Sequence, residues 1–290
     1  MVEWKNLDEL NSFKELEACE KVDLKTVMSG NEGAERAKTY SCAMAEGLTY
    51  NYAAKAVDAK VLEAIKKLAE EAQLSEKFEA LYNGEMVNTG EKRLVLHQLC
   101  RGQLGEDVIA DGVNKREFYV KQQTRIAEFA EKVHNGTITN AAGEKFTTVV
   151  QIGIGGSDLG PRAIYIALEN WARKNNTLKM EAKFISNVDP DDAAAVLNSI
   201  DVAHSLFVLV SKSGTTLETL TNEAFVKDAL KNAGLDPANH MVAVTSETSP
   251  LAKNEGYLDA FYMDNYIGGR YSSSSAVGCA VLSLAFGPKV

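Results

Sequence analysis

The chain has 290 residues, of which 45% are hydrophobic and 24% are charged, a balance typical of a globular protein with one large domain or two ordinary ones. Its formal net charge of -9 argues against nucleic acid or an acidic membrane as a partner, because the phosphate groups of either would repel it. An anionic ligand must then be held by local positive charge.

The four cysteines predict neither a zinc site nor a disulfide framework, since they form no C-x-x-C pair and have no histidine at a metal-ligand spacing. The acidic N-terminus lacks the apolar core of a signal peptide. The longest apolar run, at 276–286, is shorter than the ~20 residues needed to cross a bilayer. The sequence therefore predicts reduced thiols, no export, no membrane span and a cytoplasmic location.

The periodicity of the apolar residues changes once along the chain. From about residue 7 to residue 130 they recur at steps of three and four, which predicts helices and loops. After Asn135, short apolar runs alternate with amphipathic stretches. These predict strands over 147–154, 179–186, 205–211, 241–245 and 259–263, and helices after Gly160, Pro190, Thr215 and Pro250 and from about Ser273 to Phe286.

The fold class expected from this alternation is α/β, with a parallel sheet covered on both faces over residues 131–290. A mostly helical N-terminal segment, residues 1–130, precedes the sheet and is expected to pack on it. Ligands of such sheets bind beyond the carboxyl ends of the strands, and two polar turns follow predicted strands there.

The first turn, GIGGSDLGP at 153–161, differs from two better-known phosphate loops. The dinucleotide fingerprint needs a glycine where Asp158 stands, and the P-loop needs glycine and lysine at Asp158 and Leu159. A tight turn remains, with Ser157 offering a hydroxyl, Asp158 as a helix N-cap and Pro161 in the first turn. The alternative is a glycine-rich connection without a ligand.

The second turn, SKSGTT at 211–216, joins four hydroxyls, a lysine and a glycine directly to an apolar strand. Thr215 and Glu218 fit the T-x-x-E capping box that begins a helix. The remaining hydroxyls and N–H groups would face a bound anion, which favours a phosphate site. The alternative is that serine and threonine stand here for local turn and cap reasons.

A third stretch, DNYIGGRYS at 264–272, places Arg270 after two glycines. Glycines let the backbone approach a ligand, and a guanidinium is suited to planar recognition of an oxyanion. Taken alone, such an arginine is more often a surface ion-pair partner.

Together the three stretches closely resemble the glucose-6-phosphate isomerase (phosphoglucose isomerase) family. GIGGSDLGP, SKSGTT-x-ET and GGRYS-x-x-SA-x-G stand in the family's order and with its spacing. The upstream segments NTGEKRLVLH (88–97) and RIAEFAEKVHNG (125–136) are similar as well. The resemblance runs from roughly Gly30 to Val290.

The resemblance implies an SIS-type αβα sandwich that interconverts glucose 6-phosphate and fructose 6-phosphate, a step of glycolysis and gluconeogenesis, with no metal or organic cofactor. Its partner would be the sugar phosphate, and the family is typically homodimeric. The matching arginine, Arg270, would be catalytic by stabilising the cis-enediolate, a contribution of ~3 kcal/mol for a well-placed donor. Residues implied to bind the substrate are Gly156, Ser157, Ser211, Lys212, Ser213, Gly214, Thr215 and Thr216.

The family's glutamate base, ring-opening histidine and C-terminal lysine have no match here, and its second SIS domain is absent from these residues. A base must come within ~3 Å of the proton it removes. Glu218 is the only glutamate near the phosphate loop, and the capping box is its expected role. The chain is therefore expected to be the N-terminal portion of an isomerase and inactive by itself.

Two other classes of function stay open. A non-enzymatic SIS sensor of sugar phosphates would bind the same ligand without turnover. A nicotinamide enzyme on a similar sheet is disfavoured by Asp158 in the fingerprint position. None of the four histidines is assigned a role; His97, in the apolar context LVLHQL, is expected to be a helix-packing residue.

Overall fold

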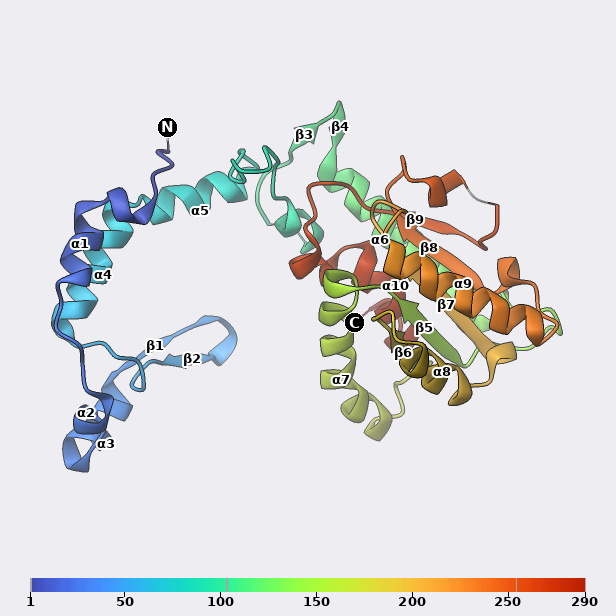
Figure 1. Ribbon diagram of the computed structural model, residues 1–290, viewed down its shortest axis with the longest axis horizontal. Coiled ribbons are helices and arrows are strands. Elements are labelled where there is room, and N and C mark those ends of the chain that lie inside the picture. Colours follow the sequence, from blue (N-terminus) through green and yellow to red (C-terminus); the bar gives the residue numbers. More distant parts are fainter. Residues whose placement is uncertain (1, 103, 254, 290) are drawn as a thin grey trace. The chain divides into compact units, whose positions relative to one another are not determined.

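The computed structural model describes residues 2–102, 104–253 and 255–289, and the chain divides into two compact units, Met1–Ala80 and Leu81–Val290 (Figure 1). The boundary expected near residue 130 falls inside helix α6 (Lys115–Asn135) instead. Buried residues of α6, among them Ile126 and Val133, belong to a core that includes the sheet, and this packing assigns α6 to the second unit.

The first unit is mostly helical, as predicted. Its helices are α1 (Asn11–Glu17), α2 (Leu24–Val27), α3 (Gly30–Thr39), α4 (Ala59–Glu71) and α5 (Leu74–Tyr82), the last of which reaches past Ala80. Strands β1 (Ser41–Ala43) and β2 (Thr49–Asn51) form an antiparallel hairpin that the helical periodicity did not predict. Buried Arg36 donates to the carbonyls of Ala53 and Val57, at 2.8 and 2.6 Å, and so holds the loop after the hairpin.

The second unit contains a parallel sheet of five strands in the order β6-β5-β7-β8-β9. The strands are β5 (Thr148–Ile152), β6 (Glu181–Ile185), β7 (Ser205–Val210), β8 (Met241–Thr245) and β9 (Ala260–Tyr262), all within the predicted ranges. The predicted α/β class with a parallel sheet is confirmed. The chain runs from β5 to β6 on one side and then to β7 on the other, so the topological switch point lies between β5 and β7.

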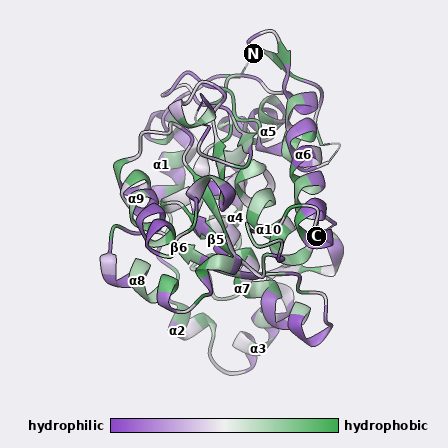
Figure 2. Cartoon of the chain, turned by 90° about the vertical axis from the view of Figure 1, so that its right-hand side faces the viewer, coloured by the Kyte–Doolittle hydropathy of each residue, from purple (hydrophilic) through white to green (hydrophobic). Residues whose placement is uncertain are grey.

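Helices cover both faces of the sheet, because side chains alternate between two cores along each buried strand. In β7, Leu206 and Val208 face a core shared with α6, α7 (Leu159–Lys174) and α10 (Ala276–Phe286). Phe207 and Leu209 face a second core with α8 (Pro190–Asn198) and α9 (Leu217–Asn232). Figure 2 shows α6 and α9 with both hydrophobic and hydrophilic residues, as expected for helices with one face in solvent.

Two predicted helices differ from those observed. The segment after Pro250 forms only a 3-10 helix, Pro250–Lys253, because Leu251 is its one buried residue and no apolar stripe continues. The last helix begins at Ala276 rather than Ser273, since the Ser275 hydroxyl accepts from the Val277 N–H and caps it there. A short hairpin, β3 (Ile109–Ala110) and β4 (Val113–Asn114), precedes α6. Among the described residues, no helix combines the length and hydropathy that a membrane crossing requires.

Candidate functional site

The first glycine-rich turn leaves β5 and leads into α7 beyond the carboxyl edge of the sheet. The turn is tight: a Cβ on Gly153 would lie 2.6 Å from the Ser157 carbonyl oxygen, and Gly155 adopts a positive φ of 57°. The Gln151 side chain donates to the Ser157 carbonyl at 2.6 Å and fixes the end of the turn. The Ser157 hydroxyl has no hydrogen-bond partner among the residues described, so it remains available to a ligand.

Asp158 occupies the N-cap position of α7 as predicted, but its side chain does not cap the helix. The carboxylate instead accepts from Arg162 Nε at 2.9 Å, one turn later in the helix. Burial raises the pKa of Asp158, and the charge of Arg162 opposes that rise. The acid therefore stabilises Arg162 and the start of α7 rather than the turn's N–H groups.

The glycines of two motifs pack backbone against backbone. A Cβ built on Gly156 would lie 2.2 Å from the carbonyl carbon of Gly269, so any side chain at Gly156 would separate the two segments. The Ser272 hydroxyl lies between them, 2.8 Å from the Gly269 oxygen and 3.2 Å from the Gly156 oxygen. The contact brings the first turn beside the segment that carries Arg270.

The second turn follows β7, the strand next to β5. The Ser211 hydroxyl accepts from the Gly214 N–H at 3.2 Å and lies 3.3 Å from Thr216 Oγ1. Ser213 Oγ accepts from the Thr215 N–H at 3.2 Å. Gly214 has a φ of 66°, and a Cβ there would lie 2.1 Å from Ser249 Oγ, so the loop needs glycine at this position. The hydroxyl cluster predicted at this strand end is thus assembled around one turn.

The predicted capping box of Thr215 and Glu218 is wrong. Helix α9 begins one residue later, with Thr216 at the N-cap position and no side-chain cap. Glu218 is exposed and forms no hydrogen bond within the described part of the chain. Because no side chain accepts from the first N–H groups of α9, they stay open to an anion that the helix dipole would also attract.

Lys212 supplies positive charge in the same loop. Its side chain is half-buried, and burial together with the nearby charge of Arg93 lowers its pKa. Its ammonium forms no ion pair with a described residue. A partly desolvated cation with a like charge nearby is a favourable place for an anion, which would relieve both effects.

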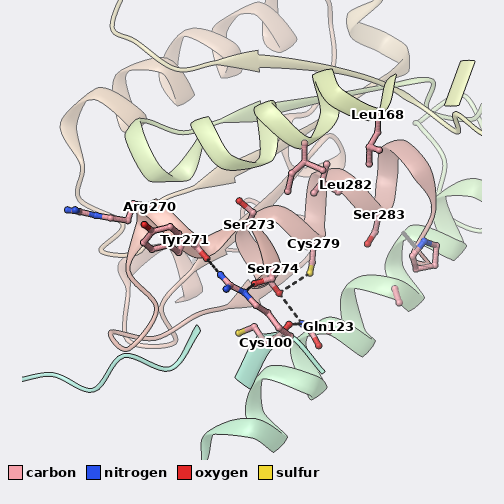
Figure 3. Close-up of a pocket in the computed structure, with 14 residues that line it drawn as sticks. Cys100, Gln123, Leu168, Arg270, Tyr271, Ser273, Ser274, Cys279, Leu282 and Ser283 are labelled. Atoms are coloured by element: carbon pink, nitrogen blue, oxygen red, sulfur yellow. Dashed lines mark hydrogen bonds between the residues drawn. The ribbon is translucent and has the colours of Figure 1, made fainter. Parts of the chain in front are cut away.

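Arg270 lies in a 3-10 helix, Gly269–Ser274, and its side chain is exposed. No hydrogen bond or ion pair holds the guanidinium to any residue that the structure describes. Figure 3 shows it pointing away from the other labelled side chains. The surface ion pair considered as an alternative for this arginine is therefore not formed.

His97 is a residue of this region that sequence reasoning missed. It lies in a 3-10 helix, His97–Cys100, rather than in an α-helix, and its Nε2 donates to the Gly268 carbonyl at 2.8 Å. Burial lowers its pKa, the hydrogen bond to the Gly268 carbonyl opposes that change, and the charges of Arg101 and Lys212 lower the pKa further. The charge of Lys212, in the second turn, thus acts on the His97 ring, and the same ring bonds to Gly268, two residues before Arg270. The similarity of NTGEKRLVLH to the family was the one sequence signal that could have identified it.

Proton NMR titration of the His97 ring tests this proximity. We expect its pKa below 6.5 in the wild-type chain. Lys212→Met should raise the pKa, because it removes a positive charge that disfavours the protonated ring. Lys121→Met, an exposed charge change on α6, serves as the control and should leave it unchanged. An unaltered His97 titration in Lys212→Met would contradict the proximity of the two side chains.

A pocket of about 660 Å³ lies beside the Arg270 segment (Figure 3). It is lined by residues of α6, α7 and α10, including Leu168, Cys279 and Leu282, and by Arg270 and Tyr271. None of the residues 211–216 lines it. The pocket is therefore separate from the hydroxyl cluster after β7.

Comparisons with known proteins agree on one family. The family model described as "Phosphoglucose isomerase" matches residues 51–289. Curated glucose-6-phosphate isomerases of Treponema denticola and Borreliella afzelii are 58% and 46% identical to the chain, over 99% and 100% of its length and 55% of theirs. The crystal structure of a glucose-6-phosphate isomerase from Chlamydia trachomatis superposes with a TM-score of 0.83 at 37% identity, over 98% of this chain and 54% of that one.

The chain spans about half the length of the curated relatives it matches. Within that half, the three motifs singled out in the sequence lie in the matched range, and the SIS-type fold is that of the isomerase structure. The chain belongs to the phosphoglucose isomerase family.

Proposed function

We propose that this chain forms the phosphate-binding half of a glucose-6-phosphate isomerase, which interconverts glucose 6-phosphate and fructose 6-phosphate. The observation that carries the proposal is the arrangement after β7: hydroxyls of Ser211, Ser213 and Thr216, the uncapped start of α9, and Lys212 in the same loop. Hydroxyls, free N–H groups and a cation at the carboxyl edge of a parallel sheet are the donors that a phosphate group requires.

The sugar would extend from this phosphate toward the first turn. Gly156 and Ser157 would lie along the sugar, because their turn follows the neighbouring strand β5 and the Ser157 hydroxyl has no partner in the described part of the chain. Gly214 and Thr215 complete the loop that surrounds the phosphate. The first turn also abuts the Gly269 segment, so the C1–C2 end of the sugar would come toward Arg270.

Arg270 would act on the charge that isomerisation creates. Transfer of a proton from C2 to C1 passes through a cis-enediolate, and a fixed guanidinium beside its oxygens stabilises that charge by ~3 kcal/mol. The proton transfer needs a base within ~3 Å. No residue here matches the glutamate base that the family resemblance implies, so we assign no base in this chain. The part of the relatives outside the matched half would supply it.

Calorimetric titration with glucose 6-phosphate, paired with an isomerisation assay of the same sample, tests the proposal. We expect binding without turnover by the chain alone, and turnover once the remaining segment of a relative is added as a second polypeptide. Binding without turnover even then would favour a sugar-phosphate sensor. A folded chain that binds no sugar phosphate would refute the proposal.

Arg270→Ala tests the chemical role in that complemented assay. We expect kcat to fall at least about a hundredfold, with KM nearly unchanged, because the guanidinium acts mainly on the enediolate. A variant that raises KM and keeps kcat would show that Arg270 binds substrate uniformly and has no role in stabilising the enediolate.

A further inference from the structure

The segment Gly268–Ser274, which carries Arg270, has little structure of its own to hold it in place. Gly268 through Tyr271 are exposed. Tyr271 departs from helical geometry, with φ and ψ of −124° and 21°, and its N–H reaches the Gly268 carbonyl over a long 3.4 Å. A surface segment of this kind can fix a side chain only through contacts from elsewhere in the fold.

Besides the packing of Gly269 on Gly156, such contacts come from one turn distant in sequence, residues 97–101. His97 Nε2 donates to the Gly268 carbonyl at 2.8 Å, just before Arg270. Arg101 donates from Nη2 to the Tyr271 carbonyl at 3.2 Å and from Nε to Ser274 Oγ at 3.0 Å, just after Arg270. The two donors therefore hold the segment on both sides of the arginine.

The turn itself is firmly held. Leu96 and Leu99 are fully buried in a small core together with Tyr119 and Ile267. Gln123 of α6 donates to the Cys100 carbonyl at 2.9 Å and to the Ser274 carbonyl at 3.0 Å, which joins the turn to the Arg270 segment directly (Figure 3). The contacts of His97 and Arg101 thus connect an exposed segment to a rigid one.

We propose that His97 and Arg101 are positioning residues that hold Arg270 at the C1–C2 end of the bound sugar phosphate. Neither touches the ligand; both act through the backbone of residues 268–274. The inference rests on the proposed function, because it requires the Arg270 guanidinium to interact with the bound sugar phosphate. A segment held in place before the ligand arrives leaves only the Arg270 side chain to be ordered on binding, and so favours ligands with negative charge at that end of the sugar.

The state of the His97 ring fits this role. Burial lowers its pKa, as do the charges of Arg101 and Lys212, and these effects favour the neutral ring. A neutral imidazole donates from one nitrogen only. The Gly268 carbonyl can only accept, so it selects the tautomer with the proton on Nε2.

Calorimetry of the 290-residue chain with two probes tests the inference. Inorganic phosphate needs only the loop after β7, whereas 6-phosphogluconate adds a carboxylate at the C1 end of the sugar. We expect His97→Ala and Arg101→Gln each to weaken 6-phosphogluconate binding about tenfold, equivalent to about 1.4 kcal/mol, and to leave phosphate binding unchanged. The amide nitrogen of Gln reaches only as far as the Nε of Arg101, so this variant loses the bond from Nη2 to the Tyr271 carbonyl. His97→Gln, whose amide can donate to the Gly268 carbonyl, should restore most of the affinity.

His134→Ala is the matched control, because His134 also bonds to a backbone carbonyl at 2.8 Å, that of Leu284, away from Arg270. It should change neither affinity. In an Arg270→Ala background, His97→Ala and Arg101→Gln should cause no further loss, since they act through the missing guanidinium.

Equal losses for both probes, or full additivity with Arg270→Ala, would overturn the positioning role and leave the proposed function standing. If the wild-type chain binds neither probe, both the proposed function and this inference are wrong. Circular dichroism checks folding of each variant, and Arg101→Gln carries the same test if His97→Ala unfolds.

Discussion

Simultaneous replacement of Ser211, Ser213 and Thr216 by alanine is expected to weaken glucose 6-phosphate binding by about 3 kcal/mol or more, which is roughly a hundredfold or more. Each hydroxyl would donate to a charged phosphate, and such bonds contribute about 1.5 to 3 kcal/mol each. The hydroxyls of Ser211 and Ser213 lie 3.3 and 3.5 Å from Thr216 Oγ1. Hydrogen bonds of this length are weak, so the hydroxyls can turn toward a phosphate at little cost in lost hydrogen bonding. Isothermal titration calorimetry measures the effect.

The neighbouring strand offers a matched control. Ser246 and Thr248 place two hydroxyls, 3.0 Å apart, beyond the carboxyl end of β8. Their joint replacement by alanine should leave glucose 6-phosphate affinity unchanged. If the Ser246 and Thr248 double variant lost affinity while the triple variant kept it, the phosphate would not bind in the loop after β7. Lys212→Met repeats the test with a single change if the triple variant does not fold.

Gly156→Ala is expected to lower the free energy of unfolding by about 3 kcal/mol, the upper part of the range for overpacking. The new Cβ would lie 2.2 Å from the Gly269 carbonyl carbon, and both partners are backbone, so neither can turn aside. The first turn and the Arg270 segment would have to separate. Urea denaturation measures the loss, and sugar-phosphate affinity should fall with it.

Alanine at two other glycines should destabilise the chain less than Gly156→Ala. Gly269→Ala should cost less, because its Cβ would lie 3.2 Å from Gly156 Cα. Gly90→Ala should be nearly neutral, since only a side-chain atom of Asn88 comes within 4 Å, at 3.8 Å. If Gly156→Ala proved as stable as Gly90→Ala, the close contact between the two motifs would not exist in solution.

The sheet could be predicted because its information is local. Each buried strand, such as β7, is an apolar run bounded by turn residues. The helices between the strands show the periodicity of amphipathic helices. The positions of the two polar turns at the carboxyl edge followed from the parallel topology. The periodicity of the apolar residues also separated a mostly helical first part from the alternating second part.

The features that sequence could not give depend on contacts between distant residues. The boundary at residue 130 was misplaced because α6 has the same helical periodicity whether it packs on the sheet or apart from it. The capping box failed because α9 begins at Leu217, which makes Thr216 the N-cap residue and places Thr219 rather than Glu218 at the third helical position. His97 was missed because its partner, Gly268, lies far along the chain.

A crystal structure of the chain with glucose 6-phosphate bound would locate the phosphate itself. We expect phosphate oxygens within hydrogen-bond distance of the hydroxyls of Ser211, Ser213 and Thr216 and the first N–H groups of α9, with the C1–C2 end of the sugar toward Arg270. A phosphate bound elsewhere, such as in the 660 Å³ pocket beside α10, would contradict this expectation.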